Sequence, residues 1–374
     1  MAGIYFHIPF CKQRCTYCDF YKSTKTDFII DFVKAVKLEL WLRRDYLGDQ
    51  QIETIYFGGG TPSLLSPKQI EGLLNACKGL FSVNHDAEIT LEANPDDLNS
   101  EYLFGIKNAG INRLSIGIQS FSDSDLQFMG RRHNSAQAIK VVADAQEAGF
   151  DNISVDLIYG IPNMPFEQWQ ANLQKVFNLK VQHLSAYHLT YHKGTKLWKA
   201  LRHNEIAEID EDESVKQFTE LVTQTKEHGF VQYEISNFAK NGLISKHNTS
   251  YWQQSKYLGL GPSAHSYNQI SRQWNISSVK LYLDAINKRQ IPAETEVLSL
   301  NDCYNDYIIT SLRTVWGIDT DIVERDFGVI LFSELLEKSK KYIQSGHLLH
   351  TNNIIKLEQK GIFISDAIMA DLMN

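Results

Sequence analysis

Short β-branched or apolar runs alternate with longer amphipathic stretches through the first half of this 374-residue chain. This alternation predicts parallel strands joined by helices, because each helix must carry the chain back to the same end of the sheet. Helical periodicity is clearest at residues 27–44, 67–80 and 136–148. Strands are predicted at residues 4–8, 54–57, 88–92, 113–118, 152–157 and 183–187. Six such units predict an incomplete α/β barrel instead of an open doubly wound sheet.

Polar residues recur where the predicted strands end. In a parallel α/β barrel the site forms at the carboxyl ends of the strands, from the loops that follow them. The first strand precedes the cysteine-rich segment 11–18, the second precedes the glycine-rich segment 58–62, and the third runs into 92–96. Gln119 ends the fourth strand, and Asp156 lies near the end of the fifth. This recurrence predicts a functional site at one end of the barrel.

Cysteines follow the first predicted strand with the spacing C-x3-C-x2-C, at Cys11, Cys15 and Cys18. Thiolates hold iron–sulfur clusters, and a cubane normally takes four. Three thiolates would leave one iron open, and an open metal position is where a substrate can bind. A zinc site would need a fourth ligand in a paired spacing, where only His7 is near, and a disulfide is disfavoured without a secretory signal. The spacing therefore predicts a [4Fe–4S] cluster.

The same spacing is the signature of the radical S-adenosylmethionine (SAM) enzymes, which this chain resembles over most of its length. In that family the open iron chelates the amino and carboxylate groups of SAM, and an electron from the cluster cleaves SAM to methionine and a 5′-deoxyadenosyl radical. The cofactor supplies the difficult chemistry, while the protein orients it and excludes water. The resemblance implies a partial (β/α)6 TIM-like barrel, with a [4Fe–4S] cluster and SAM as cofactors.

Within that family the chain resembles the coproporphyrinogen III dehydrogenases, the oxygen-independent oxidases of haem synthesis. Three consecutive glycines in segment 58–62 indicate a close backbone approach, and the resemblance implies that this loop receives the SAM amino group. Carboxylates suit an ammonium group and ribose hydroxyls, and the fork of an arginine suits a carboxylate. Taken alone, the same side chains could be strand-end caps or surface charges. The resemblance assigns SAM binding to Tyr5, Tyr17, Gly59, Gly60, Thr61, Glu92, Gln119, Arg131 and Asp156.

Two departures from those oxidases bear on the function. Their cysteine motif continues to one further cysteine, where this chain has Phe20, and they carry a segment ahead of the motif for which Cys11 leaves no room. Both differences match a sister family, the HemW-type haem chaperones, which resemble the oxidases but lack their activity. The resemblance therefore implies a chaperone that binds haem and passes it to a haem-accepting protein. Oxidation of coproporphyrinogen III is the alternative, and a radical SAM reaction on an unrelated substrate is the third hypothesis.

A second candidate site lies at residues 246–252, where the chain fits the pattern H-N-x-x-Y-W. The imidazole of His247 could ligate haem iron, and Tyr251 and Trp252 offer flat apolar surface to a porphyrin. The same residues could instead cap a helix and pack in the core, the commoner role of an aromatic pair. The resemblance implies haem binding by His247 and Tyr251. A flexible loop predicted at 259–265 ends in a second histidine, His265, which we expect in the same pocket.

Two domains are predicted. Residues 1–292 form the barrel domain, with an extension at about 191–292 where the βα pattern loosens, and residues 293–374 form a small α+β domain resembling a winged helix. In the latter, helices at 302–315 and 331–345 precede a hairpin that turns at Asn352-Asn353. The net charge of −7 argues against a nucleic-acid surface, and no apolar run is long enough to span a membrane. We expect a cytoplasmic protein whose partners are haem and an unidentified haem acceptor, with formation of a homodimer left open.

Overall fold

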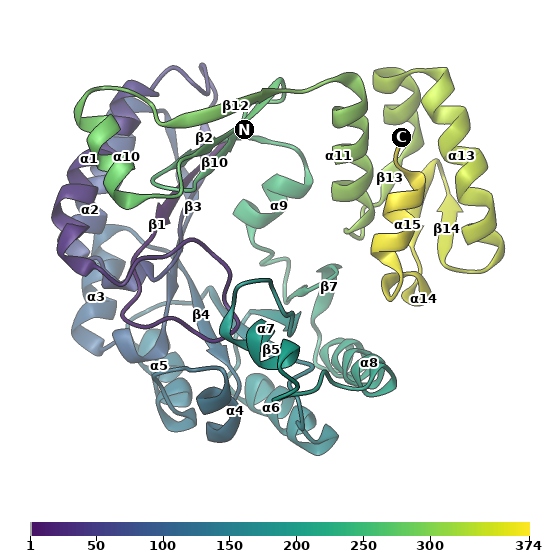
Figure 1. Cartoon of the computed structure of the whole chain (residues 1–374), viewed down its shortest axis with the longest axis horizontal. Helices are drawn as coiled ribbons and strands as arrows, with labels where there is room; N and C mark the ends of the chain where they lie inside the picture. Colours follow the sequence, from purple (N-terminus) through teal and green to yellow (C-terminus); the bar gives the residue numbers. More distant parts are fainter. Residues whose placement is uncertain (1) are drawn as a thin grey trace.

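The computed structural model describes residues 2–374 and contains a twelve-stranded mixed sheet and a separate three-stranded sheet (Figure 1). All six predicted strands form, and they lie side by side in chain order, each parallel to the next. They are β1 (Ala2–Ile8), β2 (Ile52–Gly59), β3 (Val83–Ala93), β4 (Arg113–Gln119), β5 (Ile153–Tyr159) and β6 (His183–His188). In the described chain β12 and β7 are the edges of the larger sheet, so the barrel does not close. The predicted α/β fold with an incomplete barrel is confirmed.

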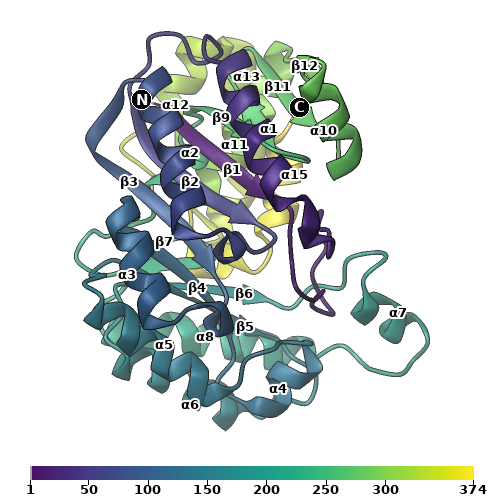
Figure 2. The same cartoon turned by 90° about the vertical axis from the view of Figure 1, so that its left-hand side faces the viewer.

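Helices connect these strands and cover one face of the curved sheet, as Figure 2 shows. They are α1 (Ile29–Leu42), α2 (Pro67–Leu80), α3 (Ser100–Ala109), α4 (Asp123–Phe128), α5 (Ser135–Glu147) and α6 (Phe166–Asn178). Helix α2 begins as its sequence predicts, because Ser66 accepts from the backbone of Gln69 while the Gln69 side chain accepts from the backbone of Ser66. The apolar faces of these helices and the sheet bury one continuous core, in which Phe6 stacks on Phe57 at 4.7 Å.

Residues 191–297 build further strands onto both edges of the parallel sheet, which the loose sequence pattern did not reveal. At the β6 edge, β8 and β7 continue the sheet antiparallel. At the other edge, β9 pairs parallel with β1, and β10 to β12 follow antiparallel. The elements of this region are α7 (Lys196–Arg202), α8 (Glu211–Glu227), β7 (Val231–Glu234), β8 (Asn237–Ala239), α9 (Lys246–Trp252), β9 (Lys256–Leu260), β10 (His265–Tyr267), β11 (Ser271–Asn275), α10 (Val279–Asn287) and β12 (Ala293–Val297).

One expectation for this region was wrong. Gly259 and Leu260 belong to β9 and are not part of a flexible loop. A Cβ at Gly259 would come within 1.9 Å of the carbonyl oxygen of His265, so only glycine permits the close approach of β9 to the start of β10. Figure 1 shows α9 between the sheet and α11, and α9 contacts β1, β2 and α11.

The C-terminal part holds its own small apolar cluster around Tyr304, Leu335 and Ile355. Its elements are α11 (Leu300–Leu312), β13 (Ile318–Asp319), α12 (Thr320–Ile322), α13 (Val329–Gln344), β14 (Leu348–Thr351), β15 (Ile354–Leu357), α14 (Gln359–Ile362) and α15 (Ser365–Leu372). The hairpin turns at Asn352 and Asn353, which both adopt positive φ angles as predicted. The proposed boundary between residues 292 and 293 stays a prediction. Within residues 2–374, no helix combines the length and apolar character that crossing a lipid bilayer requires.

Candidate functional site

A cavity of about 710 Å³ lies at the carboxyl ends of the parallel strands, lined by the loops that follow β1 to β6. This is where a parallel α/β barrel places its site. The structure brings together here most of the residues that the sequence predicts for the cluster and for SAM. They are Cys11, Cys15, Tyr17, Cys18, Gly59, Gly60, Thr61, Glu92, Gln119, Arg131 and Asp156. We call this space the cluster cavity.

Backbone hydrogen bonds hold the cysteine loop over the cluster cavity. The amide of Cys11 donates to the carbonyl of Ser23 at 3.0 Å, and the amide of Thr16 donates to Met129 at 3.0 Å. All three thiols of the loop are free. Burial raises the pKa of the Cys11 thiol, and this is partly offset by the Thr61 hydroxyl, which donates to its sulfur at 3.4 Å. Hydrogen-bond donors to sulfur are among the groups by which a protein tunes an iron–sulfur cluster.

The donor set of the loop fits a cluster better than a single metal ion. Among residues 2–374, no three His, Cys, Asp or Glu side chains are grouped to hold one ion. In a cubane each cysteine ligates a different iron, so the thiols need not converge on a single point. Cys11, Cys15 and Cys18 all face the cluster cavity without forming a disulfide. These are the residues that would hold a [4Fe–4S] cluster.

The glycine loop after β2 allows the backbone to pass close to the cysteine loop. Gly59 has a φ of 104°, which disfavours any residue with a side chain. A Cβ at Gly60 would lie 2.7 Å from the carbonyl oxygen of Phe10 and 3.1 Å from the sulfur of Cys11. The sequence-based expectation that these glycines mark a close approach is therefore confirmed, and the approach is to the cysteine loop itself.

Two carboxyl groups face the cluster cavity from β3 and β5. Glu92 accepts from the Tyr56 hydroxyl at 2.8 Å and from the Gly59 amide at 3.2 Å. Burial raises the pKa of Glu92 to about 7. Asp156 accepts from the Ser115 hydroxyl at 3.4 Å, and burial raises its pKa to about 6. Asp156 lies inside β5 and not at its end, but its side chain still reaches the cavity. Burial favours the neutral form of both carboxyl groups, and a cation bound in the cavity would favour their ionised form.

Arg131 is directed into the cluster cavity and is not the surface cation that its sequence context alone suggests. Its guanidinium donates to the sulfur of Cys15 at 3.3 Å, to Asn94 at 2.6 Å and to the carbonyl of Gly117 at 2.7 Å. Its Nε atom is buried and has no hydrogen-bond partner among the described residues. A buried donor without a partner is costly, so a ligand carboxylate at this place would be favourable. Nearby, Gln119 has a φ of 70°, a strained conformation for a non-glycine residue.

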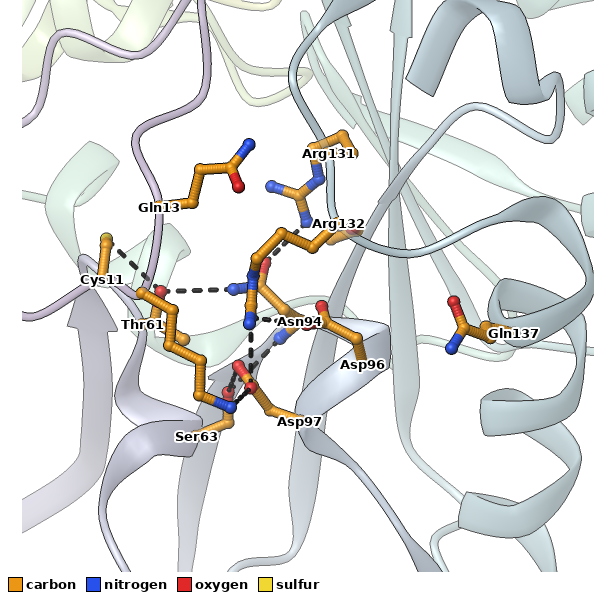
Figure 3. Close-up of polar contacts among 12 residues, drawn as sticks. Cys11, Gln13, Thr61, Ser63, Asn94, Asp96, Asp97, Arg131, Arg132 and Gln137 are labelled. Atoms are coloured by element: carbon orange, nitrogen blue, oxygen red, sulfur yellow. Dashed lines mark hydrogen bonds and ion pairs between the residues drawn. The ribbon is translucent and has the colours of Figure 1, made fainter. Parts of the chain in front are cut away.

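An ion-paired network beneath the cysteine loop was missed by reasoning from the sequence (Figure 3). Asp97 accepts from Lys12 of the cysteine loop at 2.7 Å, from Arg132 at 3.1 Å and from the Ser63 hydroxyl at 3.2 Å. Arg132 also pairs with Asp96 at 2.6 Å. This network ties the loops after β1, β2, β3 and α4 to one another. The acidic segment that follows β3 was the only signal in the sequence.

A second cavity of about 450 Å³ lies beside α9, and we call it the aromatic cavity. Tyr5 and Tyr251 line this cavity and not the cluster cavity, although the family resemblance assigns Tyr5 to SAM binding. Its lining residues are Tyr5, His7, Phe20, Tyr21, Tyr251, Trp252, Gln254, Tyr257, Ser263, His265, Tyr267, Arg272, Asp306 and Thr310. Phe20 also lines the cluster cavity, so one phenylalanine ring borders both.

His247 is buried behind the aromatic cavity. Its Nδ1 atom lies 2.7 Å from the Thr54 hydroxyl oxygen, and its Nε2 atom lies 2.8 Å from the Tyr251 hydroxyl oxygen. Its ring stacks on Tyr56 with the centroids 4.9 Å apart. Burial, followed by the charge of Arg113, lowers the pKa of His247 to about 3. The structure thus places His247 next to Tyr251 as predicted, but outside the lining of either cavity.

Comparisons with known proteins agree with this geometry. A family model described as the Radical SAM superfamily matches residues 5–176. The Bacillus subtilis protein named heme chaperone HemW is 30% identical over the whole of both chains. Its Lactococcus lactis namesake is 32% identical, over 96% of this chain and 93% of that protein. Among solved structures, coproporphyrinogen III oxidase (HemN) from Escherichia coli aligns with a TM-score of 0.86 and 22% identity, covering all of this chain and 90% of that one.

The likeness to the oxidase, at its low identity, shows the fold alone. The family match and the full-length relatives together define the class of protein, which is the radical SAM superfamily. Within that superfamily, the chain belongs to the family of the bacterial proteins named heme chaperone HemW. Membership of the superfamily implies a [4Fe–4S] cluster and SAM, which the residues of the cluster cavity fit.

Proposed function

We propose that this chain is a haem chaperone, which binds haem and delivers it to a haem-accepting protein in the cytoplasm. The observation that carries the proposal is the aromatic cavity, because it is separate from the cluster cavity and lies against the H-N-x-x-Y-W segment. Flat aromatic walls with a few polar groups suit a planar apolar ligand. The name of the full-length relatives supports the same ligand.

The proposal retains a cluster and SAM in the cluster cavity. Cys11, Cys15 and Cys18 would hold the cluster, and when bound there it supplies one-electron chemistry. The glycine loop would let SAM approach the cysteine loop closely. Glu92 would face its ammonium group, and Arg131 would face its carboxylate. The resemblance proposes Tyr17, Thr61, Gln119 and Asp156, which line the cluster cavity, as the remaining SAM contacts. It also proposes Tyr5, whose side chain lines the aromatic cavity instead.

Phe20 is the residue that argues against the alternative function, oxidation of coproporphyrinogen III. Its side chain is among the most exposed large apolar groups of the protein and borders both cavities. It stands where the oxidases that this chain resembles carry a further cysteine. An apolar ring at this position offers neither a metal ligand nor a proton donor to a substrate. The geometry of the cluster cavity therefore supports SAM binding without supporting the oxidase reaction.

We expect no conversion of coproporphyrinogen III to protoporphyrinogen IX by the reconstituted protein. The assay contains SAM and a low-potential reductant under anaerobic conditions, with product measured by fluorescence after oxidation. An active coproporphyrinogen III oxidase in a parallel tube shows that the conditions permit turnover. Turnover by this chain at a rate within about tenfold of that enzyme would overturn the chaperone proposal in favour of the alternative. The same preparation is expected to bind haem in a saturable titration.

A further inference from the structure

The aromatic cavity contains a histidine that is better placed for metal binding than the one named by the H-N-x-x-Y-W pattern. We propose that an iron porphyrin occupies the aromatic cavity with His265 as its iron ligand, while His247 positions Tyr251 in the cavity lining. This inference rests on the proposed haem-binding function and assigns the site within it. It differs from the assignment to His247 that the sequence pattern favours.

Three histidines lie at or near the aromatic cavity, namely His7, His247 and His265. They differ in whether a ring nitrogen is free to bind a metal. His247 has both nitrogens within hydrogen-bond distance of hydroxyl groups, from Thr54 and Tyr251. Both ring nitrogens of His7 also have partners. Its Nδ1 atom lies 3.3 Å from the Tyr5 hydroxyl oxygen, and its Nε2 atom lies 3.2 Å from the carbonyl oxygen of Tyr21.

His265 is the available one. No described residue forms a hydrogen bond with its side chain, which is exposed and lines the cavity. A metal ligand needs a nitrogen with a free lone pair, and of the three only His265 offers one without breaking an existing contact.

The protonation state of His265 is compatible with this role. Partial desolvation at the cavity wall lowers the pKa of the ring, and the nearby positive charge of Arg272 lowers it further. The imidazole is therefore neutral at pH 7 and can donate electrons to a metal. His247 is also neutral, but it could reach an iron only if Tyr251 moved aside, because the Tyr251 hydroxyl occupies its Nε2 atom.

The cavity walls suit a flat apolar ring. Tyr251 meets Tyr257 edge to face with the centroids 4.7 Å apart, and Tyr257 lies beside Tyr267 at 6.2 Å. Trp252 adds a further aromatic side chain, and its indole nitrogen is buried without a partner among the described residues. Aromatic side chains bury large apolar areas with little loss of side-chain freedom. The volume of about 450 Å³ is within the range of roughly 300 to 1,000 Å³ found for ligand pockets.

The charges of the cavity predict how the porphyrin is oriented. Arg272 donates to Asp306 at 3.1 Å and to Glu296 at 3.1 Å, so its charge is already balanced. Asp306 itself lines the cavity, and a second buried carboxylate beside it would be unfavourable. We therefore place the porphyrin carboxylates towards solvent and the apolar edge inside. This orientation leaves the ligand with a route of release, which a chaperone requires.

The test is a haem titration of the parent, of His265→Ala and of His247→Ala, followed by absorption in the Soret region. His265→Ala is expected to lose the ligand-dependent Soret shift and about tenfold or more in affinity, because only apolar contacts remain. His247→Ala is expected to keep the parent Soret position while its melting temperature falls. His85→Ala, which replaces an exposed histidine near the start of β3 and outside both cavities, is the matched control and is expected to match the parent in both.

Two further measurements separate loss of a ligand from loss of the fold. Added imidazole is expected to restore the Soret shift in His265→Gly, and metal-free protoporphyrin IX is expected to bind His265→Ala as it binds the parent. A parent that binds no haem refutes the proposed function. A parent that binds haem while His265→Ala keeps the shift and affinity refutes the His265 assignment alone. Loss of the shift in His247→Ala, with folding intact and His265→Ala unaffected, would return the ligand role to His247.

Discussion

Replacing Cys11, Cys15 and Cys18 together by alanine is expected to lower the iron content of the anaerobically reconstituted protein from about four per chain to near zero. The three thiols are the cysteine side chains of the cluster cavity, and no other described Cys side chain lines it. SAM binding is expected to fall below detection in the same variant, since the open iron that chelates it is lost. Iron and sulfide analysis measures the first effect, and equilibrium dialysis with labelled SAM measures the second.

The fold is expected to survive that triple substitution. The parallel strands and their helices supply a core that does not depend on the cysteine loop. Circular dichroism in the far ultraviolet should therefore match that of the parent. Cys303→Ala, made at a cysteine on α11 outside both cavities, is the control and should retain a full complement of iron. Cluster retained by the triple variant would show that the iron–sulfur assignment is wrong.

The second large effect is expected at Glu92, where glutamine should weaken SAM binding while stabilising the protein without SAM. A charge-assisted hydrogen bond contributes about 1.5 to 3 kcal/mol, so the dissociation constant for SAM should rise by roughly tenfold or more at pH 8. Glutamine can keep the two local contacts, because its oxygen accepts from the Gly59 amide and its amide donates to the Tyr56 oxygen. Isothermal titration under anaerobic conditions measures the affinity.

The pH dependence follows from the raised pKa of Glu92. Between the unfolded value of 4.5 and the folded value of about 7, the native state holds a proton that the unfolded state has released. The contribution of Glu92 to stability therefore falls as the pH rises through this window and stays low above it. Glu92→Gln has no carboxyl group to ionise and does not lose stability in this way. The difference in unfolding free energy between the variant and the parent should therefore grow by roughly 1 to 3 kcal/mol from pH 5 to pH 8.

An exposed carboxylate provides the control for both measurements. Glu101→Gln, in the first turn of α3, makes the same chemical change in a solvated position and should alter neither SAM affinity nor the slope of stability with pH. Urea denaturation at each pH gives the unfolding free energies. If Glu92→Gln binds SAM as tightly as the parent, Glu92 is not a SAM contact, whatever its effect on stability.

Local patterns in the sequence predicted the parallel strands and the place of the cluster cavity. The strand segments and α2 are recognisable because their apolar spacing and caps are encoded within a few residues. The cavity followed from one rule, that polar residues after parallel strands meet at the same end of the barrel. Gln119, which is far from Cys15 in sequence, was placed with it by that rule. Arg131 follows α4 and not a strand, and only the family resemblance assigned it to the site.

Contacts between distant segments could not be predicted in this way. Strand β9 joins β1 across about two hundred and fifty residues of chain, and its five residues carry no periodic signal of their own. His247 is held by Thr54, a contact between segments that no local pattern connects. The pattern H-N-x-x-Y-W left two roles open, a haem ligand or a helix packed in the core, and could not show that the imidazole of His247 faces inward. Such placements depend on tertiary packing, which single-sequence periodicity does not encode.

The central claim is that this chain carries haem and gives it up to another protein. The most direct test is to load the purified protein with haem, remove excess haem by gel filtration, and mix it with apomyoglobin while recording the Soret spectrum. We predict a saturable haem complex whose spectrum converts to that of myoglobin as haem leaves the chain. A protein that retains no haem after gel filtration, or whose haem never reaches apomyoglobin, would contradict the account.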